Sequence, residues 1–164
     1  MLFVFASLFI AARDFKHLIP TGGDVMALLT QDDINKLFNN GQPENRDQDN
    51  PPVVKLFYPG SNCLWLLSEL DPAYPHDAFG LCDLGMGYPE LGYVSISELK
   101  SVNFGAGFKI ERDNHFVPEF PMSVYALAAR RKGRITEDKL ALRNASETLK
   151  AEKKARQGPG LRPS

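Results

Sequence analysis

The chain has 164 residues, 43% of them apolar and 24% charged, which fits one globular domain with appendages. It contains no nucleotide-binding loop, metal-binding motif or recognisable nucleophile constellation, so the sequence assigns no reaction class and we expect no cofactor. The net charge of −1 is unevenly divided, since residues 24–120 hold fifteen acids and six bases, whereas residues 121–164 hold four acids and eleven bases. This division favours a basic tail on an acidic body.

The first twelve residues are an apolar run, too short for a membrane span of roughly 20 residues. Met26 directly precedes the first clear helix signal, so we interpret residues 1–25 as a misassigned start, with a cleaved leader as the alternative. The two cysteines, Cys63 and Cys82, lie in apolar runs typical of buried thiols. We therefore expect a cytoplasmic protein with no membrane association.

A helix is predicted to begin after Thr30, whose side chain suits an N-cap and is followed by acids in the first turn. The helix should end near Asn40, with Gly41 in the left-handed conformation. Short apolar runs separated by Pro, Gly and Asn then predict an antiparallel meander. The expected strands are 53–58, 63–70, 78–84 and 92–96, with a short edge strand at 108–111.

Further helices are predicted after the fourth strand and in the tail. Ser95 and Glu98 have the spacing of a capping box, which predicts a short helix after the fourth strand. Beyond Pro121, one helix is expected over 123–132 and a second, with a thin apolar face, from Thr136 to about Arg156. The predicted fold is thus α+β, with a single domain over 26–120 and a basic helical or disordered tail over 121–164.

A run of motifs between Trp65 and Phe116 resembles a known family. The motifs are Trp65, Glu69-Leu70-Asp71, Phe79-Gly80-Leu81, Glu90-Leu91-Gly92-Tyr93-Val94-Ser95, Ser97-Glu98-Leu99, Ile110-Glu111-Arg112-Asp113 and Phe116. Over about residues 26–120 the chain resembles domain of unknown function 2958. That resemblance implies a bacterial protein carried by plasmids and other mobile genetic elements, often near conjugation and anti-restriction genes, and it implies no catalytic residue.

Glu111, Asp113 and His115 form the sharpest chemical candidate. Their alternate spacing would place all three side chains on one face of an extended strand, where they could hold a divalent ion, with Glu69 or Asp83 nearby. The competing interpretation is a polar loop whose charges are solvated or paired.

A second candidate is the cluster Arg130, Arg131, Lys132 and Arg134, which could contact nucleic-acid phosphates together with later bases of the tail. A solubilising tail is the alternative. The aromatic residues Trp65, Phe79 and Tyr93, with Phe57, are expected in core and cross-strand packing rather than in a base-stacking platform.

Three functions from different classes remain open. The first is a non-catalytic accessory protein of a mobile element whose acidic body binds an unidentified protein partner, acting as a host-defence antagonist. The second is a small metal-dependent hydrolase or nuclease centred on Glu111, Asp113 and His115. The third is a nucleic-acid-binding module that uses the basic tail.

Overall fold

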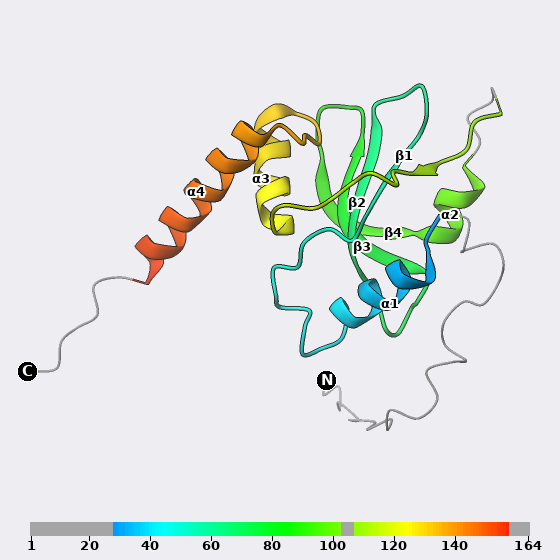
Figure 1. The fold of residues 1–164 in the computed structure, drawn as a ribbon, viewed down its shortest axis with the longest axis horizontal. Helices are drawn as coiled ribbons and strands as arrows, with labels where there is room; N and C mark the ends of the chain where they lie inside the picture. The colour runs from blue at the N-terminus through cyan, green and yellow to red at the C-terminus, as the bar shows by residue number, and fades with distance from the viewer. Residues whose placement is uncertain (1–27, 103–106, 158–164) are drawn as a thin grey trace, which may run out of the picture.

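The computed structural model describes residues 28–102 and 107–157 and shows a five-stranded antiparallel sheet with helices on both faces (Figure 1). The elements in chain order are α1 (Gln31–Asn40), β1 (Val54–Phe57), β2 (Cys63–Leu70), β3 (Asp77–Leu84), β4 (Glu90–Ser95), α2 (Ile96–Ser101), β5 (Glu111–Arg112), α3 (Met122–Lys132) and α4 (Lys139–Arg156). The α+β class is confirmed, as are the helix before the meander and the short helix after its fourth strand. The predictions for residues 1–25 and 158–164 lie outside the described residues.

The strand order in the sheet is β4-β3-β2-β1-β5, and every neighbouring pair is antiparallel. The first four strands follow one another as hairpins, and the chain then returns across the sheet so that β5 pairs with the free edge of β1. β5 contains two residues, whereas β4 contains six. The two edges of the sheet are therefore very different in length.

The first face of the sheet packs against α1 and α2. Trp65 and Leu67 of β2 point to this face because successive side chains of a strand alternate, and they join Leu37 of α1 and Ile96 of α2 in one buried cluster. Thr30 caps α1 as predicted. Gly41 does not adopt the predicted left-handed conformation, since its φ is −76°. It is required for another reason, because a Cβ there would lie 1.9 Å from the Leu70 carbonyl oxygen.

The second face is covered by α3, which buries its apolar residues against Leu66 and Leu81. Gly133 ends α3 in the left-handed conformation, with φ 67°. The side chains of Met122 and Tyr125, only 5% and 2% exposed, belong to this second core cluster. The sequence predicts a domain that ends near residue 120, but the packing of α3 makes the following segment part of the body.

The last helix, α4, packs on α3 through Leu142 and Ala145 and then extends away from the body (Figure 1). Its N-cap is Asp138, whose carboxylate accepts from the Ala141 N–H at 2.7 Å, and not the predicted Thr136. Asp138 is the N-cap because its carboxylate accepts from a backbone N–H of the first turn that has no partner within the helix. Thr136 accepts only from the Asp138 N–H. Residues 150–157 are exposed.

The cysteines lie on neighbouring strands but are not directly opposite each other. Cys63 pairs with Leu84, and Cys82 pairs with Trp65. Both thiols are free. Burial raises the pKa of the Cys82 thiol to about 11, so this residue is a weak nucleophile at neutral pH.

Gly80 and Gly92 face each other across β3 and β4, yet substitutions at the two positions should have opposite effects. A Cβ at Gly80 would lie 2.1 Å from the Leu66 carbonyl oxygen, whereas a Cβ at Gly92 would meet open space. We expect Gly80→Ala to lower the free energy of unfolding by about 3 kcal/mol through a backbone clash. Gly92→Ala should raise it by about 0.5 kcal/mol because the unfolded chain loses freedom. Urea unfolding of both variants measures the difference, and equal effects would contradict it.

Candidate functional site

The chain turns immediately after β5, so Glu111, Asp113 and His115 do not share the face of one extended strand. The strand ends at Arg112, and the Asp113 carboxylate accepts from the His115 backbone N–H at 2.9 Å in a local turn. A hydrogen bond from that N–H and another from Lys55 hold the pKa of Asp113 below its usual value. Residues 28–102 and 107–157 contain no group of three or more His, Cys, Asp or Glu side chains placed to hold a metal ion.

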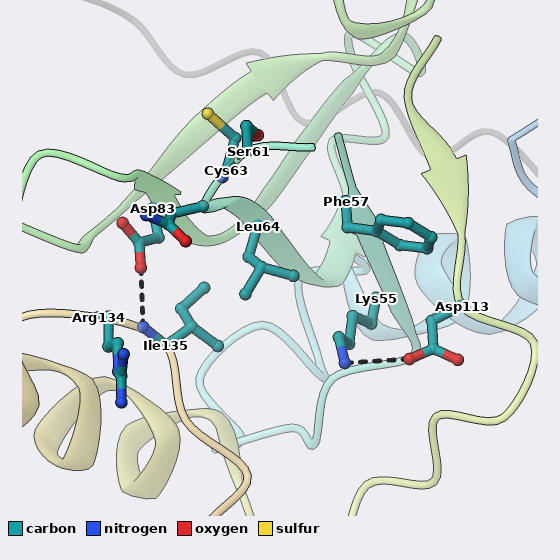
Figure 2. Close-up of a pocket in the computed structure, with 10 residues that line it drawn as sticks. Lys55, Phe57, Ser61, Cys63, Leu64, Asp83, Asp113, Arg134 and Ile135 are labelled. Carbon is teal, nitrogen blue, oxygen red and sulfur yellow. Dashed lines mark hydrogen bonds and ion pairs between the residues drawn. The ribbon is translucent and has the colours of Figure 1, made fainter. Parts of the chain in front are cut away.

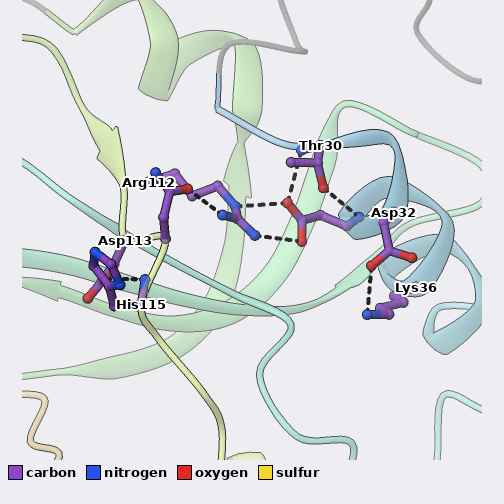
Figure 3. A network of polar contacts seen from close by, with 8 residues as sticks. Thr30, Asp32, Lys36, Arg112, Asp113 and His115 are labelled. Carbon is purple, nitrogen blue, oxygen red and sulfur yellow. Dashed lines mark hydrogen bonds and ion pairs between the residues drawn. The ribbon is translucent and has the colours of Figure 1, made fainter.

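Arg112, between the predicted metal-binding residues, joins β5 to the first turn of α1 (Figure 3). Its guanidinium donates to both carboxylate oxygens of Asp33, at 2.9 and 3.1 Å. The same carboxylate accepts from the Thr30 N–H at 2.9 Å, so Asp33 completes the capping box of α1 and binds Arg112 at once. Burial acts to raise the pKa of Asp33, but the hydrogen bonds from Arg112 and Thr30 outweigh it and lower this pKa.

A cleft of 340 Å³ lies where the end of the sheet meets the α3–α4 connection (Figure 2). We call it the Lys55 cleft. It brings together Asp113 and Arg134, two residues that the sequence assigned to different candidate sites. Lys55 binds Asp113 at 3.0 Å, also forms an ion pair with Glu137, and lies 5.9 Å from the centroid of the Phe116 ring.

The ionised groups of the Lys55 cleft are mostly engaged by other groups of the chain. Asp83, 1% exposed, accepts from the backbone N–H groups of Gly85 at 2.9 Å and Ile135 at 2.8 Å. Burial opposes ionisation of Lys55, but the hydrogen bonds from its ammonium to Glu137 and Asp113 raise its pKa. Lys55 is therefore protonated at neutral pH and holds segments of the chain together, which is a structural use of these charges.

Glu69, which the sequence offers as an additional metal ligand, lies elsewhere, opposite Phe79 at a β-bulge in β2. Burial raises the pKa of its carboxyl group, and this effect is opposed by the charge of Arg46 and a hydrogen bond from Asn50. These partners give Glu69 a role in attaching the loop over residues 42–52 to the sheet.

Three of the four predicted nucleic-acid-binding residues lie in the last turn of α3, and Arg134 follows its C-cap Gly133. The four residues line three different hollows. Arg130 lines a groove beside β4, Arg131 and Lys132 line a hollow between α3 and α4, and Arg134 lines the Lys55 cleft. The Arg131 guanidinium donates to the Thr148 hydroxyl at 3.1 Å. The four residues therefore do not line one common pocket.

A different surface stands out at the end of β3, the following turn and β4. Five large apolar side chains are exposed within this one hairpin, which we call the apolar edge surface. They are Leu84 (59% exposed), Met86 (76%), Tyr88 (83%), Leu91 (46%) and Tyr93 (54%). Tyr93 makes the predicted cross-strand contact with Phe79, at 5.2 Å between ring centroids, but it is not a core residue.

A groove of 580 Å³ runs between this hairpin and α3. Leu81, Leu91 and Ala126 supply apolar surface, and Tyr88 lies at the turn. We call it the β4–α3 groove. It combines an apolar lining with the guanidinium of Arg130, which is a combination suited to binding another chain.

The sequence did not reveal the apolar edge surface because its residues have the composition of core strands. Leu91 and Tyr93 alternate as half-buried strand residues do, and only the strand order shows that β4 is an edge. One usable signal was the run Leu84-Gly85-Met86-Gly87-Tyr88, in which large apolar residues lie in a turn.

No helix in the described part of the chain is both long enough and apolar enough to cross a membrane. A search of curated proteins and a search of solved structures gave no significant match. A family model described as "Protein of unknown function (DUF2958)" matches residues 28–136. The match extends from the first helix through α3, in agreement with the packing of α3 on the sheet. The chain belongs to the DUF2958 family.

Proposed function

We propose that this protein is a non-catalytic accessory protein that binds a protein partner through the apolar edge surface. The observation that carries the proposal is the exposure of five large apolar side chains in a single hairpin at an open edge of the sheet. Single exposed apolar residues scattered over a surface are common and need no explanation. Several of them within one hairpin indicate an interaction site. Tyrosine is also enriched among residues that dominate binding energy.

The family resemblance supports a more specific version of the proposal. It implies a bacterial mobile genetic element as the setting, in which a small binding protein without an enzyme site would serve as a host-defence antagonist. The acidic balance of residues 24–120 would then help to select a partner.

The metal-dependent hydrolase has less support. Asp113 already binds Lys55 and the His115 N–H, so the recruitment of Asp113 to a metal would break the Lys55–Asp113 ion pair. The mutual engagement of Lys55, Asp113 and Glu137 instead favours a structural role for the cleft.

Loss of the exposed apolar side chains should abolish partner binding without unfolding the protein. The test variant is Tyr88→Ser, Leu91→Thr and Tyr93→Thr, which retains good strand formers in β4. The matched control is Val117→Ser with Leu140→Ser, two apolar residues that are 74% and 68% exposed elsewhere. Proteins captured from a bacterial host are compared by quantitative mass spectrometry. We expect a partner that wild type and control retain and that the test variant does not, and equal capture by all three would overturn the proposal.

A nucleic-acid contact is a second candidate function, supported by bases that the body does not neutralise. Among the bases of residues 130–156, Lys139 is the one that forms an ion pair with another described residue, to Glu119 at 3.0 Å. The bases of α4 beyond Leu149 are Lys150, Lys153, Lys154 and Arg156, all exposed.

Removal of these charges should weaken DNA binding and reduce its salt dependence. We expect Lys150→Gln with Lys153→Gln and Lys154→Gln to lower affinity and to reduce the salt slope in proportion to the number of phosphates that are no longer neutralised. Fluorescence anisotropy with labelled single- and double-stranded DNA measures both. Lys36→Gln with Lys109→Gln, exposed lysines of the body, is the control. Removal of α3 is avoided because α3 is part of the core. Equal salt slopes for wild type and the α4 variant would contradict this candidate.

A further inference from the structure

The two edges of the sheet differ in how they are protected from further strand pairing. β5 is two residues long, and the ion pairs Arg112–Asp33 and Lys55–Asp113 hold its region against the body. β4 is six residues long, pairs with β3 in continuous register from Asp77–Ser95 to Cys82–Glu90, and has no strand beyond it among the described residues.

β4 carries one exposed charged residue, Glu90, but lacks other features by which proteins usually block an open edge. These features include lysine or proline within the strand, a bulge, or a very short length. β4 contains neither lysine nor proline, and its register with β3 has no irregularity. An edge of this form presents unpaired backbone N–H and C=O groups to an incoming strand.

Gly92, in the middle of β4, has no structural explanation within the described chain. Its φ is not positive, and a Cβ there would meet no atom within 4 Å. Glycine inside a strand weakens it, and it commonly marks a place where another backbone or ligand approaches closely. Because a Cβ at Gly92 would meet no atom within 4 Å, the first face of the sheet has room above this position of β4 for a large side chain.

The β4–α3 groove supplies the second element of recognition, on the other face of the same strand. Leu81 and Leu91 point to this face, and Arg130 approaches it from α3. Arg130, which lines the groove, forms no ion pair with another described residue. A carboxylate on the occupant would therefore find an uncompensated guanidinium.

We infer that an extended segment of a partner protein adds to the sheet as a sixth strand along β4, with a large apolar side chain over Gly92 and an acidic side chain at Arg130. Strand addition of this kind takes affinity from main-chain hydrogen bonds and specificity from alternate side chains. A large side chain over an edge glycine fills space that the glycine leaves open. This inference rests on the proposed function and specifies the chemistry of the partner.

A second copy of this chain is a poorer occupant. The side chains of β4 on the first face are Glu90, Gly92 and Val94, so paired β4 strands would provide no aromatic residue to cover Gly92. A self-pairing edge would also leave the Arg130 guanidinium without an assigned carboxylate. A partner segment that carries both an apolar and an acidic residue satisfies both requirements.

The test uses short random peptides displayed on phage and selected against the full-length protein. The best selected sequence is synthesised, and its affinity is measured by fluorescence anisotropy. We expect selected peptides with alternating large apolar and acidic residues. Methylation of backbone nitrogens at alternate positions on one edge of the peptide should weaken binding about tenfold or more, because each methyl group removes a main-chain donor. Methylation on the other edge should have little effect.

Two protein variants complete the experiment. Gly92→Val should weaken peptide binding about tenfold or more while urea unfolding shows an intact fold, since its side chain fills the space beside the edge. Arg130→Glu should weaken binding of an acidic peptide. Replacement of the peptide acid by lysine should restore binding to this variant. Equal affinity after methylation on either edge, or no selected peptide at all, would overturn strand addition.

The experiments separate failure of strand addition from failure of the proposed function. If the Tyr88, Leu91 and Tyr93 variant loses its captured partner but backbone methylation has no effect, the surface binds a partner by side chains alone and this inference is wrong. If analytical ultracentrifugation shows a concentration-dependent dimer that Gly92→Val abolishes, the occupant is a second copy, and our assignment to a partner segment is overturned.

Discussion

Replacement of Arg112 by alanine should lower the free energy of unfolding by about 3 kcal/mol, because it leaves the Asp33 carboxylate buried without its counter-charge. The side chain of Asp33 is 5% exposed, whereas that of Arg112 is 25% exposed, so the loss falls mainly on the buried acid. The capping box of α1 depends on the same carboxylate, and α1 should lose part of its N-terminal cap.

The Arg112–Asp33 pair also predicts a pH dependence. The pKa of Asp33 is lowered in the folded protein, since hydrogen bonds from Arg112 and Thr30 outweigh the effect of burial. Its stabilising contribution is therefore present above the unfolded pKa of about 4 and is lost as pH falls through the lower folded pKa. Wild type should lose its advantage over Arg112→Ala below about pH 4.

Urea unfolding of both proteins across an acidic pH series measures these effects. Lys36→Ala is the control, because Lys36 forms an exposed ion pair with Asp32 at 2.7 Å and its loss should have little effect on the free energy of unfolding. If Arg112→Ala and Lys36→Ala prove equally mild, Arg112 does not hold α1 to the sheet edge.

Asp83→Ala is the second change with a large expected effect, a loss of about 3 kcal/mol in the free energy of unfolding. Asp83 accepts from the N–H of Ile135, a residue that is 6% exposed, and its removal leaves that donor buried without an acceptor. The Gly85 N–H, on an exposed turn, is expected to bind water instead.

The loss of Asp83 should destabilise the α3–α4 connection more than the rest of the protein. Hydrogen exchange should become faster in residues 133–142, while β2 and α1 remain protected. Asp138→Ala, which removes only the exposed cap of α4, is the control and should cost about 1 kcal/mol. Unchanged exchange at Ile135 in the Asp83 variant would show that this carboxylate does not anchor the connection.

Local sequence signals predicted the elements of this fold well where the responsible interactions are local. The cap at Thr30 depends on Asp33, three residues away, and Gly133 ends α3 through its own backbone conformation. Gly41 was assigned the wrong conformation because its requirement comes from Leu70, a residue distant in sequence. No local sequence pattern indicates that the Leu70 backbone lies this close to Gly41.

The same distinction explains the sites. The alternation of Glu111, Asp113 and His115 predicted a shared strand face, but a turn set by the Asp113 carboxylate ends the strand early. Arg112 binds Asp33, and Lys55 binds Glu137. Both partners lie far away in the sequence. The exposure of Leu91 and Tyr93 follows from the position of β4 in the sheet, which spacing alone does not determine.

The most direct test of the proposed function is hydrogen exchange on the complex between this chain and the partner that wild type retains. We predict slower exchange in residues 84–95, with the strongest protection in β4, and little change in the Lys55 cleft or in α4. Protection confined to α4 or to the residues around Lys55 and Asp113, with residues 84–95 unchanged, would contradict binding through the apolar edge surface.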